Sequence, residues 1–286
     1  MLRTLTLFFA LFFLGTATSP AKEDLPRSET LGERQLKVLV QEEKEIWEIL
    51  KSRTNQEDIE TLRPRLRDIA ASYDNIISEN PDFVAAYVSY GLLLSRIGER
   101  KASVTFFLQA NEIDPNIPLV KNQLGNYCIE EGEYEEALSY YLSAIKLAPE
   151  EPLYRYQLGT LLTEFRRFFI ADELFSKETL EKKMHEAFQK AATLAPSDFG
   201  YACRYAESFY DLREPNWEEA LLLWETLEEM APTNVEKQTA QLHRANIYLK
   251  QERFLGARLL LNKITEASLE SNKQTLLDQL NQEAEN

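Results

Sequence analysis

The chain has 286 residues, of which 44% are hydrophobic, and this is enough to bury a core without metals or disulfide staples. Acidic residues outnumber basic ones by 47 to 32, which gives a net charge of −15. Binding to nucleic acid or to an anionic membrane surface is therefore disfavoured, because both need a cationic protein surface. In residues 111–151, nine acidic side chains are opposed only by Lys121 and Lys146. That stretch is either a solvated outer face or a surface that attracts a basic partner.

The N-terminus predicts a secretory signal peptide over residues 1–21. Arg3 precedes an apolar run over residues 5–14, and small residues follow it. Ten residues of helix span about 15 Å, roughly half of a bilayer core, so a stable membrane span after cleavage is not expected. Cleavage after Ala17 or Ala21 would release the mature chain. We therefore expect an exported protein, periplasmic or secreted, with a bacterial periplasm favoured.

A polar linker is predicted over residues 22–34, and helices follow it over residues 35–83. From Leu36 onward, apolar residues recur every three to four positions, and no segment alternates convincingly as a strand would. The apolar residues around Tyr73 fit the second helix of a degenerate repeat. The chain is therefore expected to be all-α.

Proline spacing indicates internal repeats. Pro81, Pro115 and Pro149 are 34 residues apart, and each follows a helix with an apolar stripe. Proline ends such a helix because it cannot donate to the helical ladder. Between the prolines, small and aromatic residues recur at matching positions: Gly91, Ser103 and Phe107 in one unit, then Gly125, Ala137 and Tyr141 in the next.

These positions resemble those of the tetratricopeptide repeat (TPR) family, whose unit is two antiparallel helices with a small residue in each where the axes approach. The resemblance implies a right-handed α-solenoid of antiparallel helix pairs that binds protein. Interlocking at short distance does require one helix ridge to lack bulk. The predicted units cover residues 84–117, 118–151, 152–198, 199–234 and 235–271, and a capping helix follows over residues 272–286.

The third unit is longer than the others. Pro196 lies 47 residues after Pro149, which is 13 more than the repeat period. The surplus is predicted near residues 176–186, as a lengthened second helix or an extra helical segment. Ala171 and Phe175 are expected to take the small and aromatic positions of this unit.

The sequence contains no recognisable catalytic constellation. It lacks a Gly-rich phosphate loop, a Cys-x-x-Cys motif and a Gly-x-Ser-x-Gly elbow. Glu181 and His185 could share a helix face, but two ligands are too few to hold a metal. Cys128 and Cys203 fall two helix pairs apart, too far for a disulfide. We expect no enzymatic activity, no cofactor and no metal.

In the TPR family the first helices of successive units line a concave groove for a peptide or a partner's helix. The corresponding stripe is Val88, Leu92, Asn122, Asn126, Tyr156 and Thr160. Asn122 and Asn126 could each donate to and accept from an extended peptide backbone, or they could simply be solvated. The stripe holds no lysine or arginine, so we expect no clamp for a C-terminal carboxylate.

A second candidate interface is aromatic and lies near the surplus. It consists of Phe165, Phe168 and Phe169, with Phe175 nearby and Arg166 and Arg167 between the rings. Aromatic and arginine side chains together suit a protein interface. The alternative is that these rings fill the core of a longer helix pair.

The leading hypothesis is an exported TPR-type adaptor or scaffold that holds a protein or peptide in an envelope-associated complex. The alternative is a structural or oligomerisation subunit that acts through its outer surface and the N-terminal helix over residues 35–51. The two differ in self-association, because an adaptor purified alone should be monomeric.

Overall fold

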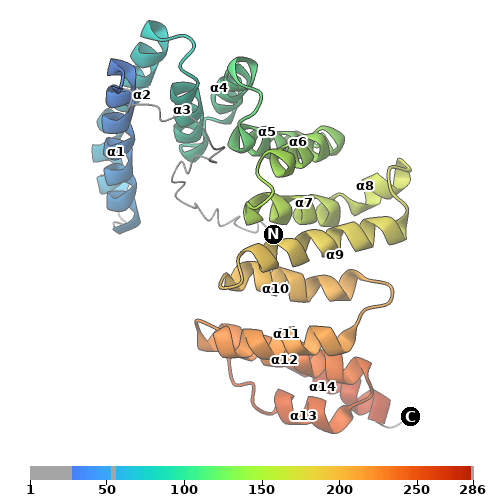
Figure 1. Ribbon diagram of the computed structural model, residues 1–286. Helices are drawn as coiled ribbons and strands as arrows, with labels where there is room; N and C mark the ends of the chain where they lie inside the picture. The colour runs from blue at the N-terminus through green and yellow to red at the C-terminus, as the bar shows by residue number, and fades with distance from the viewer. Residues whose placement is uncertain (1–27, 53–55, 285–286) are drawn as a thin grey trace. The chain divides into compact units, whose positions relative to one another are not determined.

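The computed structural model describes residues 28–52 and 56–284, and these form helices and no strand (Figure 1). The predicted signal peptide lies outside the described residues. Two compact units divide the chain, Met1–Ile69 and Ala70–Asn286.

The first unit contains α1 (Leu31–Ser52) and the start of α2 (Gln56–Glu79). The helix α1 begins inside the region predicted as linker, because Thr30 and Glu33 form a capping box. The Glu33 carboxylate accepts from the backbone N–H of Thr30 at 2.7 Å, and the Thr30 hydroxyl oxygen accepts from the backbone N–H of Glu33 at 3.2 Å. These bonds satisfy N–H groups that a helix start otherwise leaves unpaired. The predicted linker boundary at residue 34 was therefore wrong.

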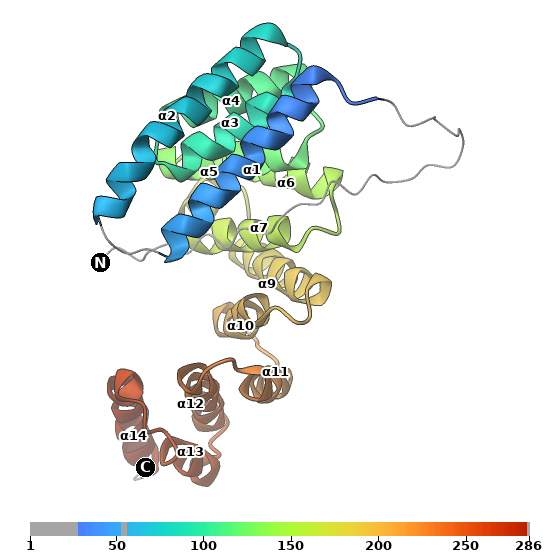
Figure 2. The same cartoon turned by 90° about the vertical axis from the view of Figure 1, so that its left-hand side faces the viewer.

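The second unit is a stack of helix pairs (Figure 2). Its helices after α2 are α3 (Val84–Arg96), α4 (Arg100–Ile113), α5 (Pro118–Glu131), α6 (Tyr134–Leu147), α7 (Pro152–Glu164), α8 (Arg166–Ala171), α9 (Lys177–Leu194), α10 (Phe199–Ser208), α11 (Trp217–Met230), α12 (Asn234–Lys250), α13 (Phe254–Leu261) and α14 (Glu270–Ala284), with short 3-10 turns η1 (Phe209–Asp211) and η2 (Ala267–Leu269). The pairs are α3/α4, α5/α6, α7/α9, α10/α11 and α12/α13, and each second helix packs on the next first helix. The helix α14 closes the stack against α12 and α13. The predicted all-α solenoid is confirmed.

A glycine-to-ring contact joins the two helices in each of the first three pairs. Because glycine has no side chain, the ring of the second helix can lie directly against the backbone of the first. A Cβ atom added at the glycine would lie 2.7 to 2.8 Å from a ring carbon: Gly91 against Phe107, Gly125 against Tyr141, and Gly159 against Phe188. Such a distance is shorter than any ordinary contact, so glycine is required at this spacing.

The turn inside each unit depends on the residue that ends the first helix. Gly98 and Gly132 are one repeat apart and adopt left-handed φ angles of +87° and +82°. This conformation is open to glycine and lets the second helix begin almost at once. The next residue in the period is Arg166, whose Cβ makes that conformation unfavourable. There, α7 is followed by the short helix α8 instead.

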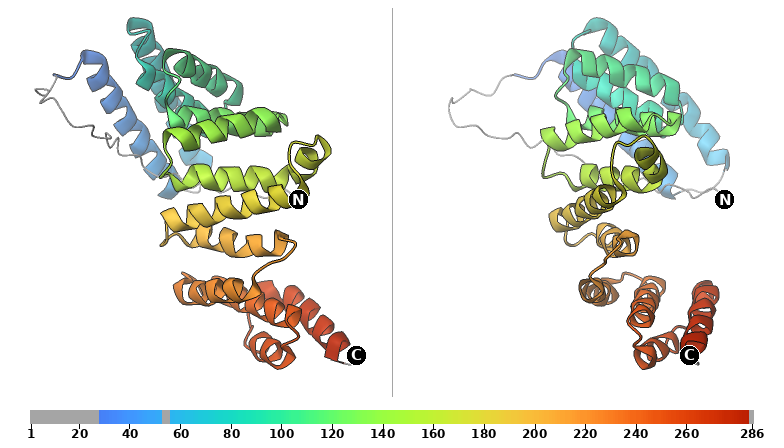
Figure 3. Two further views of the ribbon diagram at one scale, coloured as in Figure 1. Left: turned by 45° about the vertical axis from the view of Figure 1, so that its right-hand side comes forward. Right: turned by 90° about the vertical axis from the view of Figure 1, so that its right-hand side faces the viewer.

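The surplus of the third repeat takes both predicted forms, an extra helix and a lengthened second helix, but it begins at α8 and not near residue 176. Repeat spacing aligned Phe175 with Tyr141, but the ring that packs on Gly159 belongs to Phe188. The second helix, α9, is therefore in register 13 residues later. The extra residues are α8, the turn after it and the first residues of α9, which has 18 residues where α4 and α6 have 14. Ala171 lies exposed at the end of α8. In Figure 3 α8 stands out at the edge of the stack, in yellow-green.

The fourth unit is also lengthened between its two helices. The 3-10 turn η1 follows α10, and the chain then runs to Asn216, whose side chain caps α11 by accepting from the backbone N–H of Glu219 at 3.3 Å. Both irregular units therefore carry their extra residues in the same kind of turn. Figure 1 shows α8 and the α10–α11 turn on the same edge of the stack.

Candidate functional site

Tyr134, the first residue of α6, connects the second repeat, residues 118–151, to α8. Its ring stacks on Phe165 at 5.8 Å and on Phe168 at 5.5 Å between centroids, and it meets Phe169 edge-on at 5.2 Å. The Tyr134 hydroxyl donates to the carboxylate of Asp172, just after α8. That hydrogen bond is the largest cause that raises the pKa of Tyr134 to about 12. Four aromatic rings and one hydrogen bond thus fix α8 to the preceding repeat.

On its other side, α8 is tied to the turn of the fourth unit. The Arg166 guanidinium donates to the Glu181 carboxylate and lies 3.5 Å from Asp211 Oδ1 in η1. The backbone N–H of Arg213 donates to Glu181 Oε2 at 3.2 Å. Glu181 is only 4% exposed, so these donors are what allow its charge to be buried. The short helix is therefore held between two neighbouring repeats.

The second predicted interface is divided by the structure. Phe169 is fully buried, so its proposed role in an interface was wrong, and its ring fills the core instead. Phe165 is half-buried between Tyr134 and Phe168. Phe168 is 54% exposed, and Leu174 after α8 is 44% exposed. Leu174 was not singled out from the sequence, because only the turn after α8 exposes it.

The predicted groove also changes. Asn122 on α5 is 1% exposed, and its side-chain oxygen is buried without a hydrogen-bond partner. It cannot offer its carboxamide to a ligand on this surface, so that part of the prediction was wrong. Asn126, one turn later, is half-buried and accepts a hydrogen bond of 2.7 Å from the Tyr141 hydroxyl. Asn126 also lines a cleft of about 40 Å³ that α3 and α4 share with α5.

The remaining groove residues are half-buried. Val88 and Leu92 on α3 pack beside the apolar cluster around Phe107. The Thr160 hydroxyl donates to the backbone carbonyl of Tyr156 at 3.0 Å. Tyr156 contacts both Phe188, at 5.9 Å, and Tyr201 on α10, at 5.3 Å. These ring contacts carry the stack past α8 into the fourth unit, so the insert does not interrupt the row of first helices.

Comparison with known proteins identifies the repeat. The tetratricopeptide repeat profile matches residues 84–117 and 118–151, the two units whose helices are α3/α4 and α5/α6. The chain contains tetratricopeptide repeats. Among curated proteins, none matches the sequence of this chain.

Several solved structures share the fold. One, described as YrrB, a TPR protein with an unusual peptide-binding site, is 22% identical with a TM-score of 0.56, over 68% of this chain and 91% of that one. PilF of Pseudomonas aeruginosa is 16% identical with a TM-score of 0.57, over 88% and 100%. The C-terminal part of a TPR repeat-containing protein from Cytophaga hutchinsonii is 15% identical with a TM-score of 0.56, over 87% and 99%.

Glu181 and His185, the two residues that could share a helix face, bind different partners. His185 Nδ1 lies 2.8 Å from the Ser208 hydroxyl, whereas Glu181 binds Arg166. Burial lowers the pKa of His185 and of His243. Within the part of the chain that the structure describes, no three His, Cys, Asp or Glu side chains are grouped so as to hold a metal ion.

Both cysteines of the TPR stack are free thiols, Cys128 buried and Cys203 half-buried. Burial raises the pKa of Cys128 to about 11 and that of Cys203 to about 12. The reactive thiolate is therefore scarce near neutral pH. No disulfide joins the two cysteines, as predicted.

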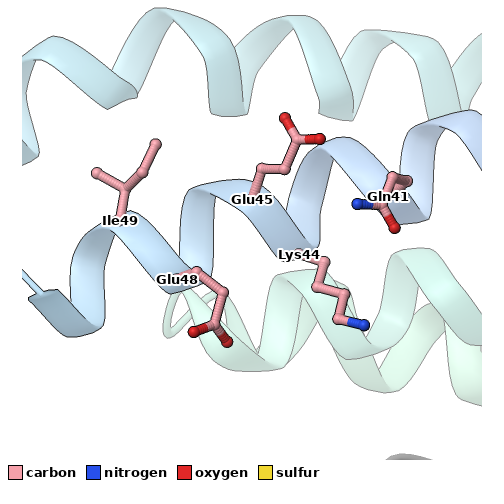
Figure 4. A pocket seen from close by; sticks show the side chains of 5 residues that line it. All are labelled: Gln41, Lys44, Glu45, Glu48 and Ile49. Atoms are coloured by element: carbon pink, nitrogen blue, oxygen red, sulfur yellow. The ribbon is translucent and has the colours of Figure 1, made fainter.

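A shallow depression lies on α1, outside the TPR stack (Figure 4). It is lined by Gln41, Lys44, Glu45, Glu48 and Ile49, all from one helix. A site for a small molecule normally encloses its ligand between several elements, and this depression does not. Among the described helices, none has the length and apolar content that a bilayer span requires.

Proposed function

We propose that the chain is an exported adaptor that holds a protein or peptide segment along the first helices α3, α5 and α7. The observation that carries this proposal is the fixed orientation of the Asn126 side chain. Its oxygen is held by the Tyr141 hydroxyl at 2.7 Å, which orients the carboxamide at the cleft between the first two repeats. The amide N–H groups are then preorganised to donate to a peptide carbonyl.

The ligand of this groove is a largely uncharged, extended segment. In the cleft beside Asn126, the charges of Arg100 and Glu130 are paired with each other. Elsewhere on the first helices, the half-buried Val88, Leu92 and Thr160 offer apolar surface and a hydroxyl but no charge. Recognition of a peptide backbone with pockets for apolar side chains fits such a surface. The TPR fold is shared with a protein described as having an unusual peptide-binding site, which supports the general class. No catalytic role is proposed.

The test is site-specific photocrosslinking in intact cells. A photoreactive residue at position 126 or 160 is expected to capture a partner, whereas the same residue at Gln109 or Ser139, exposed on the second helices α4 and α6, is not. The captured segment is then made as a peptide and its affinity is measured by calorimetry. Crosslinks of equal yield at all four positions would contradict the groove.

Substitutions in the groove test the same proposal through the affinity of the peptide. Asn126→Lys combined with Thr160→Lys is expected to weaken that peptide by about tenfold or more, because two long cations enter a neutral groove. The matched control is Gln109→Lys combined with Ser139→Lys, which makes the same charge change on the outer helices and should leave the affinity within about twofold.

Export and an envelope-associated complex are part of the proposal and rest on residues 1–21. The mature protein is expected to begin after Ala17 or Ala21, which N-terminal sequencing of the protein from fractionated cells would show. A protein that keeps its first residues and stays in the cytoplasm would remove this part of the proposal and leave the groove untouched.

The alternative, a structural subunit, is favoured by one observation on α1. Leu31 and Val38 are 66% and 60% exposed. Sedimentation at micromolar concentration separates the two functions. We expect a monomer; a dimer abolished by Val38→Ser would support the structural subunit instead.

A further inference from the structure

The edge of the solenoid at α8 exposes apolar side chains on a fixed support. We define the insert edge as Tyr134, Phe165, Phe168, Asp172, Glu173 and Leu174. Its apolar members Phe168 and Leu174 are 54% and 44% exposed, on either side of the end of α8. Apolar side chains in this state add little to the stability of the fold and remain available for contact with a partner.

The support is rigid on both sides. Tyr134 stacks on Phe168 at 5.5 Å and donates to Asp172, so the second repeat fixes one side. Arg166 binds Glu181 and lies 3.5 Å from Asp211, so the fourth repeat fixes the other. A surface that is already ordered loses little conformational entropy when a ligand binds.

The two segments that carry the insert edge are mostly acidic, and the exposed cations Arg167 and, on α9, Lys177 lie close to them. Residues 130–136 and 164–173 contain eight acidic side chains and two basic ones. Of the basic pair, Arg166 is occupied by Glu181 and Asp211, which leaves Arg167 as the exposed cation of these two segments. Of the acidic ones, Glu130 pairs with Arg100. The remaining carboxylates leave the edge negative where its apolar side chains reach solvent.

We propose that the insert edge docks a cationic segment of a partner protein, with an apolar anchor against Phe168 and Leu174 and lysine or arginine beside the carboxylates. Apolar contact provides the affinity of such an interface, while charge complementarity provides its selectivity and association rate. This inference goes beyond the groove, because it concerns a different surface and a cationic ligand in place of an uncharged one.

Two other occupants are disfavoured by the same charges. A second copy of the chain would bring the same acidic edge and a net charge of −15. An anionic lipid surface would meet the carboxylates of Asp172 and Glu173 directly. Both pairings oppose like charges, whereas a cationic segment removes the repulsion.

The probe is a short fluorescent peptide with lysine on one helical face and leucine on the other, and its binding to the purified protein is followed by anisotropy. Phe168→Ser combined with Leu174→Ser is expected to weaken binding by about tenfold. The matched control is Leu108→Ser combined with Leu142→Ser, which removes two leucines that are 45% and 49% exposed on α4 and α6. The control should bind like the unaltered protein, and equal losses in both variants would overturn the proposal.

Charge is tested separately. Glu135→Gln with Glu136→Gln removes two carboxylates beside Tyr134, and Glu112→Gln with Glu150→Gln removes two others from the same acidic stretch. The first pair is expected to weaken binding by about threefold or more and to reduce its salt dependence, while the second changes little. A peptide with glutamate in place of lysine that binds equally well would overturn the proposal.

The competing surfaces are tested with the same reagents. Asn126→Ala with Thr160→Ala alters the groove without changing charge, so peptide binding should persist. Its loss there would assign the peptide to the groove and overturn this inference. Loss of a dimer, or of vesicle binding, on Phe168→Ser would do the same in favour of a second copy or a membrane. If the double variant loses its circular dichroism signal, Leu174→Ser alone replaces it, because Leu174 lies outside the helices.

Discussion

The two regular repeats, residues 84–151, and the third repeat, residues 152–198, solve the same packing problem with different lengths of chain. All three press a ring of the second helix onto a glycine of the first. The regular pair closes its turns with Gly98 and Gly132, whereas the third has Arg166 at that position and inserts α8. The glycine-to-ring contact therefore sets the stacking of the helices, whereas the turn between them can vary in length.

The ring that fills the third unit gives the largest expected effect. Phe188→Ala removes a fully buried ring and should cost about 3–5 kcal/mol of unfolding free energy. Phe175→Ala removes a half-buried ring and should cost about 1 kcal/mol. Urea denaturation of both variants measures the difference. A larger loss for Phe175 would restore the uninterrupted 34-residue register.

Alanine at the contact glycines should have the next largest effect. In Gly91→Ala, Gly125→Ala and Gly159→Ala the new methyl group meets a ring carbon within 2.8 Å. We expect overpacking to cost about 1–3 kcal/mol, partly offset by about 1 kcal/mol from alanine's better helix propensity. The same measurement on all three tests the comparison. A loss in the regular units alone would show that the third unit is held together differently.

A double variant separates this contact from general strain. Tyr141→Leu should relieve most of the cost of Gly125→Ala, because the residue that the methyl group meets is then smaller. Gly132→Ala serves as the control, since nothing lies within 4 Å of its Cβ position and only its left-handed φ is affected. Tyr141→Leu should therefore not relieve the cost of Gly132→Ala.

Removing the insert should lower the stability of the protein by less than these substitutions do. Deleting residues 167–179, with Arg166→Gly for the turn and Glu181→Tyr to match Tyr134, gives the third unit the length of the second. Because the contact of Gly159 with Phe188 remains, we expect a folded protein whose Tm falls by about 2–4 °C, equivalent to about 1 kcal/mol. Thermal circular dichroism measures the shift. A variant without cooperative unfolding would show that α8 is needed for the stack.

The smallest predicted effect is a loss of stability in the later repeats at acid pH. Burial lowers the pKa of His185 in α9 and His243 in α12, and the described part of the first two repeats contains no histidine. The unfolded chain therefore takes up protons first, and stability is lost as pH falls below about 6.5, by at most about 1.4 kcal/mol per pH unit for each histidine.

Hydrogen exchange at pH 7.5 and 5.5 checks this effect. Protection should fall in α9 to α12 before it falls in α3 to α6. His243→Phe, which keeps a ring against Trp224, should remove part of the pH dependence. An unchanged dependence would exclude His243 as its source.

The sequence predicted the regular repeats well because each of their signals is local. The prolines, the glycines and the aromatic residues all lie within one unit, and their spacing is enough to align the helices. The prediction for the third repeat was wrong because Ala171 and Phe175 repeat the small-x-x-x-aromatic pattern at the expected distance. Only three-dimensional packing shows that Phe188 is the ring that reaches Gly159.

The candidate surfaces were predicted less completely. Periodicity placed Asn122 and Asn126 on one stripe, but it could not show that neighbouring helices bury the first and leave the second half-exposed. The phenylalanine cluster was found by composition, whereas the exposure of Leu174 depends on where α8 ends. The N-terminal linker was predicted to extend to residue 34, but the capping box at Thr30 starts α1 at Leu31.

The location of the extra residues has a consequence for engineering. Both lengthened units add chain in the turn between their two helices. The third keeps its glycine-to-ring contact, and in the fourth Ala206 and Trp224 stay buried in the same core. A longer loop costs little entropy at such a point, because each doubling of its length adds only about 0.6 kcal/mol. The turns at Gly98 and Gly132 are therefore natural sites for grafting an epitope, a fluorophore-binding loop or a second recognition module onto the scaffold.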